Sequence, residues 1–226
     1  MIVGARPFVQ KHDTRRDADE AMSVRLHNTL RGELSPDYTE EENGKRLVNI
    51  FWEHLEDAGY RMDYVGPYLP DPMNPSVTNP RSYERFLKER GCPNIPLNIG
   101  VIGLAIRARQ SYLVRSIPEL EEEQGKGAHW ACNKDQNPEN RPKTELVLML
   151  NSRVETGPFR GIYAPRAVLD LDFLEEDAVS ELLAHRLKEI WKEFGKILFP
   201  GPPQYDVSQY APHIPLAPID ENSCQI

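Results

Sequence analysis

The residues of this chain that could do covalent chemistry are its three cysteines, Cys92, Cys132 and Cys224. A thiolate is a soft nucleophile that attacks an electrophilic sulfur, such as that of a sulfoxide, and leaves a sulfenic acid on the protein. A second thiol within reach condenses with the sulfenic acid to a disulfide, which an external reductant must reopen. Unpaired cysteines are also common as small half-buried residues. The sequence leaves both interpretations open for Cys92 and Cys132.

Three acidic residues lie in segments that we expect to form strands. Glu145 begins one apolar run, and Asp170 and Asp172 lie within another. Residues two apart on a strand point to the same face, so the two aspartates share a side of the sheet. An ionised carboxylate could hold an ammonium group, and a protonated one could help a sulfoxide oxygen leave as water. Crowding of carboxylates favours a protonated member. The same residues could instead cap loops or face solvent.

The stretch 92–114 contains the first of these cysteines and predicts strand, turn, helix, turn and strand. Ile95-Pro96-Leu97 is short and apolar, and Gly100 and Gly103 open the helix. The missing Cβ of a glycine lets another backbone or a ligand come close at such a turn. Extended structure resumes at Tyr112-Leu113-Val114. Any close-packed turn of an α/β domain could look like this, so the motif alone does not show a binding site.

The second cysteine follows His129-Trp130-Ala131 and opens a polar loop that runs to Lys143. His129 and Cys132 have the spacing of two metal ligands, but no second pair accompanies them, so we expect no metal site. Trp130 could be a lid over a small ligand or an anchor in the core. Cys224, near the end of the chain, has the fewest constraints.

The remaining segments are predicted from the spacing of hydrophobic residues and from residues that end helices and strands. Residues 1–13 look like a loose leader, and residues 14–34 form a helix whose narrow apolar stripe packs on the domain or meets its copy in a dimer. That stripe consists of Ala18, Met22, Leu26 and Leu30. Thr39 and Glu42 form a capping box for a second helix, which ends at Gly59.

A strand over 60–65 follows, and residues 66–76 contain too many prolines for a central strand. Asn79-Pro80 is expected to start a short helix that ends at Gly91. The acidic stretch 115–126 is expected to be a solvated face or loop. Strands are expected at 145–150 and 167–172. A last helix with a wide apolar face runs to Leu198, and a proline-rich strap or disordered tail follows.

The bulk properties exclude several classes of function. A chain of 226 residues fits one domain with extensions, or at most two small ones. A formal net charge of −8 offers no basic surface for nucleic acid. The sequence also has no run of about 18 apolar residues, the length that a membrane span needs. The N-terminus lacks the apolar segment of a signal peptide, and an odd cysteine count suits thiols in a reducing compartment. We therefore expect an acidic cytoplasmic protein without cofactors.

Two motifs together resemble the GAF fold. One is Ile-Pro-Leu-x-x-Gly-Val-Ile-Gly, from Ile95 to Gly103, and the other is the Leu-Asp-Leu-Asp strand that precedes a helix with acids in its first turn. The order of the predicted helices and strands indicates an α+β domain whose sheet is flanked by helices from both ends of the chain. The resemblance implies that this central sheet is antiparallel and GAF-like. It divides the sequence into an N-terminal helical extension (1–38), a GAF-like domain (39–199) and a proline-rich C-terminal tail (200–226).

Among GAF proteins the chain is most similar to the free methionine-(R)-sulfoxide reductases. Their pattern has a cysteine three residues before Ile-Pro, like Cys92, and a second cysteine after His-x-Ala, like Cys132. A glutamate opens the next strand and two aspartates lie on the last one. The resemblance implies that Cys132 is the nucleophile and Cys92 the resolving thiol. It assigns substrate binding to Glu145, Asp170, Asp172 and Trp130.

The chain also departs from that pattern. Ile102 occupies the position of a third cysteine of the family, and the loop from Cys132 to Glu145 is longer than usual. Three hypotheses therefore stay open. The first is a reductase of free methionine-(R)-sulfoxide that a thioredoxin-like donor recycles. The second is a non-catalytic GAF module that binds a small molecule in a sensory or regulatory role. The third is an interaction protein that forms a homodimer through its N-terminal helix. A bilin photoreceptor is disfavoured, since no histidine directly follows a cysteine.

Overall fold

The computed structural model describes residues 6–74, 77–80, 95–97, 100–124 and 141–210. Its helices are α1 (Arg6–Glu33), α2 (Glu40–Asp57), α4 (Gly100–Ala108), α5 (Ile117–Gln124), α6 (Glu181–Leu198) and α7 (Val207–Tyr210). Its strands are β1 (Met62–Pro70), β2 (Val77–Pro80), β3 (Ile95–Pro96), β4 (Tyr112–Val114), β5 (Thr144–Arg153) and β6 (Tyr163–Phe173). None of these helices is long and apolar enough to cross a membrane.

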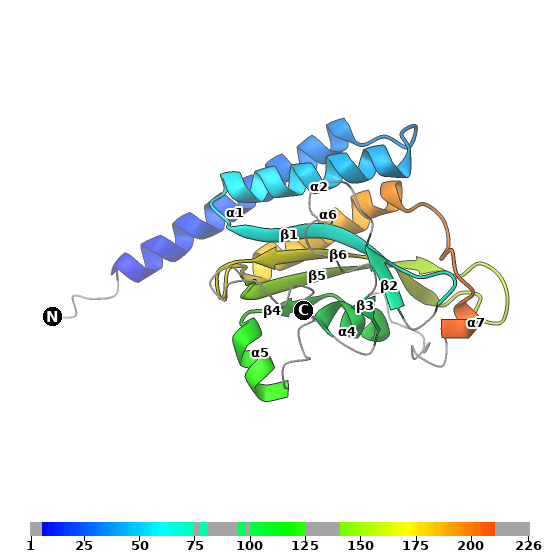
Figure 1. The fold of residues 1–226 in the computed structure, drawn as a ribbon. Coiled ribbons are helices and arrows are strands. Elements are labelled where there is room, and N and C mark those ends of the chain that lie inside the picture. Colours follow the sequence, from blue (N-terminus) through cyan, green and yellow to red (C-terminus); the bar gives the residue numbers. More distant parts are fainter. Residues whose placement is uncertain (1–5, 75–76, 81–94, 98–99, 125–140, 211–226) are drawn as a thin grey trace.

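The strands form one antiparallel sheet in the order β3-β2-β1-β6-β5-β4. The three long strands β1, β6 and β5 lie at its centre. Figure 1 shows α1, α2 and α6 on one side of the sheet and α4 on the other. Since α1 and α2 come from the beginning of the described chain and α6 from near its end, helices from both ends flank the sheet. The expected α+β architecture is confirmed.

The first core fills the space between the sheet and the helices α1, α2 and α6. Met22, Leu26 and Leu30 of α1 are completely buried there, together with the apolar face of α6. A narrow stripe four residues apart is enough to bury α1, because α2 and α6 both contact it. Of the two outcomes expected for this stripe, the structure shows packing on the domain. Ala18, the fourth residue of the predicted stripe, is exposed.

Helix α1 starts earlier than the sequence predicted. It begins at Arg6, so the interpretation of residues up to 13 as a loose leader is wrong for 6–13. Once the packed part of a helix has formed, each further residue adds one hydrogen bond at little cost. Pro7 does not interrupt it, because the N–H groups of a first turn have no intrahelical acceptor.

The capping box at the start of α2 is confirmed. The backbone N–H of Glu42 donates to Oγ1 of Thr39 at 3.2 Å, and the N–H of Thr39 donates to Oε2 of Glu42 at 2.9 Å. The bond from the Thr39 N–H, together with one from its hydroxyl to the same carboxylate at 2.8 Å, lowers the pKa of Glu42. Two N–H groups that the helix cannot satisfy itself thus find acceptors, and the boundary is fixed locally.

The prediction that residues 66–76 avoid the central sheet is wrong for 66–70. Strand β1 continues through Gly66 and Pro67 to Pro70, and it lies between β2 and β6. The two prolines are tolerated because each occupies a position where a backbone N–H donor is not required. At Pro67, β1 pairs with β6 alone, since pairing with β2 begins only at Tyr68, and Pro70 is the last residue of the strand. One side of the strand at Pro67 therefore needs no N–H donor.

Two further segments are compared with their expectations. Asn79 and Pro80 end strand β2 instead of starting a helix, because Asn79 pairs with Leu69 and Pro80 with Tyr68. The rest of that expected helix, 81–91, lies outside the described residues. The acidic stretch after Val114, expected to be a solvated face or loop, contains helix α5, in which Ile117 is buried while Glu119 and Glu122 are exposed. Pairing with the preceding strand β1 overrode the local preference at Asn79 and Pro80.

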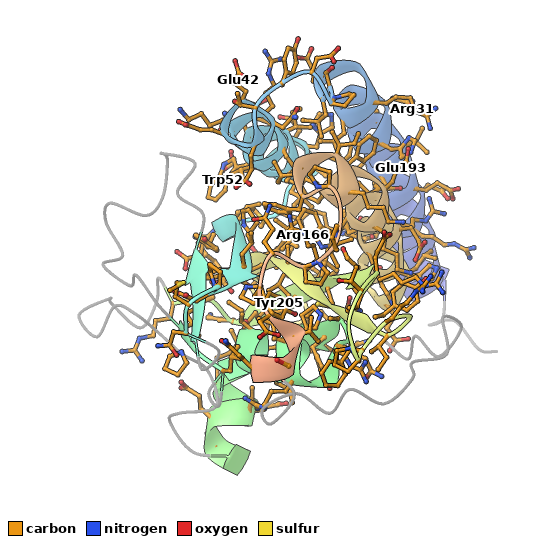
Figure 2. All side chains as sticks on the ribbon, turned by 90° about the vertical axis from the view of Figure 1, so that its right-hand side faces the viewer. Arg31, Glu42, Trp52, Arg166, Glu193 and Tyr205 are labelled. Carbon is orange, nitrogen blue, oxygen red and sulfur yellow. The ribbon has the colours of Figure 1, made fainter. Side chains whose placement is uncertain are left out.

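The second core lies on the face of the sheet opposite the first, where Val147, Met149 and Val168 pack beneath α4. After α6 the chain returns to this face. Tyr205 and Val207 are buried in the second core, and the Tyr205 hydroxyl donates to the carbonyl oxygen of Pro165 at 2.7 Å. Figure 2 shows this segment running from the end of α6 past Arg166 to Tyr205. The described part of the proline-rich tail is therefore a strap.

Candidate functional site

Strand register places polar side chains in neighbouring rows on the face that carries the second core. The first row is Tyr64, Asp172, Glu145 and Val114, the second is Gly66, Asp170, Val147 and Tyr112, and the third is Tyr68, Val168 and Met149. Each row crosses the sheet from β1 through β6 to β5. Because directly opposed residues in an antiparallel sheet lie about 5 Å apart, the side chains of one row are in reach of one another. All three acids that the sequence singled out fall in the first two rows.

Glu145, Asp170 and Asp172 form a cluster that we call the acid triad. Their exposed fractions are 2%, 4% and 4%, and one carboxylate oxygen from each lies within 4.8 Å of the others. Three buried carboxyl groups at this spacing concentrate negative charge where little water can screen it. The arrangement suits a cationic group, which an ammonium could supply and which a hard metal ion could also satisfy with oxygen ligands. Carboxylate geometry alone does not distinguish these occupants.

Two tyrosines of β1 lie beside the triad, and sequence reasoning missed them. The rings of Tyr64 and Tyr68 have centroids 6.0 Å apart, and both side chains are buried. Burial, the neighbouring Tyr64 and the Asp170 carboxylate raise the pKa of Tyr68 well above its usual value, and a hydrogen bond to Tyr64 adds to this. Tyr68 thus stays a neutral phenol that keeps its proton. The alternating pattern of β1 could have revealed it, had the prolines not argued against a strand there.

Gly66 makes room for Tyr64. A Cβ atom at residue 66 would lie 2.6 Å from Cζ of the Tyr64 ring, which is far closer than ordinary van der Waals contact. Gly66 is also the residue of β1 directly opposite Asp170. The ring of Tyr64 therefore lies over its own strand, between the first and second rows of the site. Only glycine permits this position.

Helix α4 lies above this face. Val101, Ile102, Ala105 and Ile106 are buried in the second core, and α4 contacts both β5 and β6. At Gly103 an added Cβ would come within 2.7 Å of the carbonyl oxygen of Leu97. The expected close approach at this glycine is thus a contact with the protein's own backbone. Ile102, which replaces the third cysteine of the reductase pattern, is 5% exposed and packs as a core residue.

The remaining predicted site residues are not placed. Cys92, Cys132 and Trp130 lie outside the described residues, as do His129 and Cys224. The structure therefore brings together the three acids predicted to bind substrate, and it adds Tyr64 and Tyr68 to them. The pairing of Cys92 with Cys132 stays a prediction.

The comparisons with known proteins bear on the fold. No protein-family model matches the sequence, and no curated protein matches it. A solved GAF domain is similar, with a TM-score of 0.56 and 15% identity over 81% of this chain and 86% of its own. The reduced form of fRMsr from Staphylococcus aureus has a TM-score of 0.56 and 20% identity, over 78% of this chain and 94% of its own.

A free methionine-R-sulfoxide reductase from Neisseria meningitidis, solved in complex with its substrate, is also similar. Its TM-score is 0.53 and its identity 20%, over 80% of this chain and 87% of its own. Likeness at such identities shows the fold and leaves the activity open. The chain has the GAF fold.

Proposed function

We propose that this protein reduces free methionine-(R)-sulfoxide with two thiols, Cys132 as nucleophile and Cys92 as resolving thiol. The observation that carries the proposal is the buried acid triad on strands β5 and β6 of a GAF fold, because the resemblance assigns those three residues to substrate binding. Structures of the same fold include reductases of this kind, and the one from Neisseria meningitidis was solved with its substrate. The triad would hold the ammonium group that distinguishes a free amino acid from a methionine residue in a chain.

The proposed chemistry needs no cofactor. The Cys132 thiolate attacks the sulfoxide sulfur and forms an S–S bond, and the oxygen takes up a proton. The hydroxyl group then moves to the Cys132 sulfur as this S–S bond and the substrate S–O bond both break. The substrate sulfur is reduced to a thioether, and Cys132 is oxidised to a sulfenic acid that keeps the oxygen. The Cys92 thiol then displaces that oxygen as water and forms the disulfide. A triad carboxyl group or a neutral phenol beside it would supply the proton to the oxygen. A thioredoxin-like dithiol would reopen the disulfide.

Intact mass and thiol counting on reduced protein test this proposal. Adding free methionine-(R)-sulfoxide without oxygen should yield methionine and remove two thiols, with the mass falling by two hydrogens. Cys132→Ser should abolish product, while Cys224→Ser should leave the yield unchanged. Methionine released at the wild-type rate by Cys132→Ser would disprove the assigned nucleophile.

Substrate analogues test the role of the triad. N-acetylation removes the ammonium charge, so N-acetyl-methionine-(R)-sulfoxide should bind more weakly. Glu145→Gln should weaken binding of the free amino acid about tenfold or more, because hydrogen bonds to charged groups are the strong ones. Glu176→Gln, an exposed acid after β6, is the matched control and should bind normally. Equal affinity for the two ligands would contradict an ammonium site.

A non-catalytic small-molecule-binding module is the second candidate. The observation that favours it is Ile102, a packed core residue at the position where the reductase pattern has a cysteine. This function predicts that a ligand binds the triad while every thiol persists. Retention of all thiols by wild-type protein in the presence of a bound amino acid would decide for it.

A further inference from the structure

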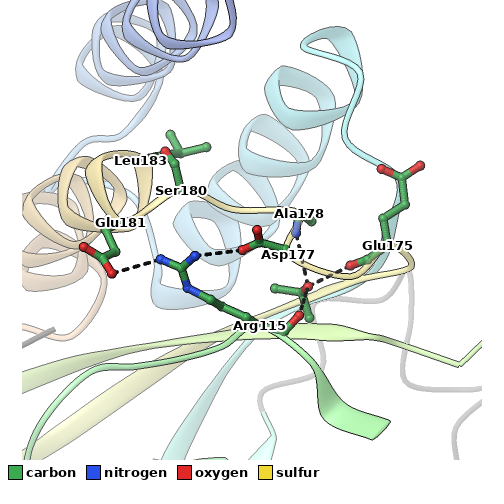
Figure 3. Close-up of polar contacts among 8 residues, drawn as sticks. Arg115, Glu175, Asp177, Ala178, Ser180, Glu181 and Leu183 are labelled. Atoms are coloured by element: carbon green, nitrogen blue, oxygen red, sulfur yellow. Dashed lines mark hydrogen bonds and ion pairs between the residues drawn. The ribbon is translucent and has the colours of Figure 1, made fainter. Parts of the chain in front are cut away.

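The hydroxyl of Thr144 joins three segments at one end of the acid triad. Its Oγ1 can donate to the carbonyl oxygen of Glu175 at 2.7 Å or to that of Arg115 at 3.0 Å, and it accepts from the backbone N–H of Ala178 at 3.2 Å. Figure 3 shows these contacts between the start of β5, the end of β4 and the turn before α6. Thr144 is completely buried. We call this set of hydrogen bonds the Thr144 clamp.

Backbone hydrogen bonds reinforce the clamp on both sides. The N–H of Lys143 donates to the carbonyl oxygen of Phe173 at 2.7 Å, and that of Ile117 donates to the carbonyl oxygen of Lys143 at 2.8 Å. The N–H of Asp177 donates to the carbonyl oxygen of Arg115 at 2.8 Å. Asp177 has a φ of 48°, which is unfavourable for a residue other than glycine and must be held by its surroundings. The turn after β6 is therefore fixed to β4 and β5 rather than free.

The clamp is adjacent to the acids in register. Thr144 immediately precedes Glu145, Phe173 immediately follows Asp172, and the pair Thr144–Phe173 is next to the pair Glu145–Asp172 on the β5–β6 ladder. Because alternate residues of a strand face opposite ways, the Thr144 side chain points away from the triad. It can act on the acids only through the backbone of β5 and of the turn that follows β6.

We propose that Thr144 is a positioning residue whose hydroxyl sets the spacing of Glu145 and Asp172, and hence the affinity of the triad for a cationic ligand. The identity of that ligand rests on the proposed function, but the effect on geometry does not. An exposed ion pair of Arg115 with Asp177 at 3.0 Å and with Glu181 at 2.9 Å links the same turn to β4. Such pairs contribute little when water screens them. The hydroxyl of the buried Thr144 is the stronger constraint, since its loss removes the acceptor of the Ala178 N–H and the donor to the Glu175 carbonyl oxygen in a partly buried position.

Three variants separate positioning from mere loss of stability. Thr144→Val keeps the shape and removes the hydroxyl, and Thr144→Ser keeps the hydroxyl and removes a methyl group. Ser180→Ala is the matched control, because Ser180 caps α6 through the N–H of Leu183 at 3.1 Å and makes no contact with Thr144 that the structure shows. Thr144→Val and Ser180→Ala each remove one hydroxyl group, and both should lower the melting temperature of the protein.

Binding and turnover of free methionine-(R)-sulfoxide provide the first comparison. Thr144→Val should raise Kd and KM about ten- to hundredfold, by analogy with the loss seen when a group that orients a metal ligand is removed. Thr144→Ser should restore both to nearly wild-type values, and Ser180→Ala should leave them unchanged. Wild-type affinity in Thr144→Val, or an equal loss in Ser180→Ala, would overturn the proposal.

A second comparison does not depend on the ligand. The carboxyl-carbon NMR signals of Glu145 and Asp172, followed as pH is varied, report the mutual spacing of these groups. They should change in Thr144→Val and persist in Thr144→Ser and Ser180→Ala, with exposed Glu176 as the internal reference. If wild-type protein neither binds nor reduces methionine sulfoxide, the proposed function fails, while this comparison still tests the role of the Thr144 clamp. Unchanged triad signals in Thr144→Val would refute it.

Discussion

Gly66→Ala should destabilise the protein through a single contact, the one between the new methyl group and the ring of Tyr64. The Cβ would lie 2.6 Å from Cζ of that ring, and Tyr64 is only 2% exposed, so the ring has little space to move into. Forcing a methyl group into a packed core costs about 1–3 kcal/mol. For a protein of this size each kcal/mol corresponds to roughly 2–4 °C in Tm.

A double-mutant cycle isolates this contact. Tyr64→Ala should itself cost about 3–5 kcal/mol, as truncation of a buried aromatic residue usually does. In that background the methyl group of Gly66→Ala enters vacated space, so it should add almost nothing. The two substitutions should therefore be less than additive by about 1–3 kcal/mol. Urea unfolding of the four proteins, followed by tryptophan fluorescence and far-UV circular dichroism, measures the coupling.

The control is Gly32→Ala. A Cβ at residue 32 meets no atom within 4 Å, and Gly32 lies in α1. Alanine there should stabilise the protein by about 0.5–1 kcal/mol, because it lowers the backbone entropy of the unfolded chain. If Gly66→Ala and Tyr64→Ala are additive to within about 0.5 kcal/mol, the steric reasoning is wrong.

Three further predictions concern the periphery. A hydrogen bond from His27 and the charge of Arg31, both in α1, lower the pKa of Glu193 in α6 below its usual value. Figure 2 shows Arg31 and Glu193 on these two helices. A carboxyl group whose pKa is lower in the folded than in the unfolded protein stabilises the fold at pH values above its unfolded pKa. This contribution disappears as the pH falls through the folded pKa, so Glu193→Gln should cost about 0.5 kcal/mol at neutral pH and nothing in strong acid. Urea titrations at several pH values would show it, and a cost independent of pH would contradict it. Thr39→Ala removes the cap of α2 and should cost about 1 kcal/mol in urea unfolding, whereas Thr39→Ser should cost far less. Tyr205→Phe removes the hydrogen bond to the carbonyl oxygen of Pro165 and should cost about 0.5–1.5 kcal/mol. Hydrogen exchange near α7 should then rise before that of α6, and simultaneous exchange would argue against a separate strap.

Local features determined much of the fold from the sequence. The capping box of Thr39 and Glu42, the turn into α4 and the wide apolar face of α6 depend on residues within a few positions of one another. The alternation in β6 was equally local, and it placed Asp170 and Asp172 on one face of the sheet. Short-range hydrogen bonds and helical or strand periodicity decide such features, so one sequence suffices to find them.

Pairing between strands decided the rest. Pro67 sits in a central strand because the pairing of β1 with β2 begins one residue later, and Asn79-Pro80 became strand because β1 was there to pair with it. The register between β5 and β6 put Glu145 opposite Asp172, which no local pattern could specify. The same register placed Thr144 where its hydroxyl meets two other segments. The sequence thus determined which side chains could do chemistry, and only the sheet decided that three acids from two strands share one site, since register depends on partners distant in the chain.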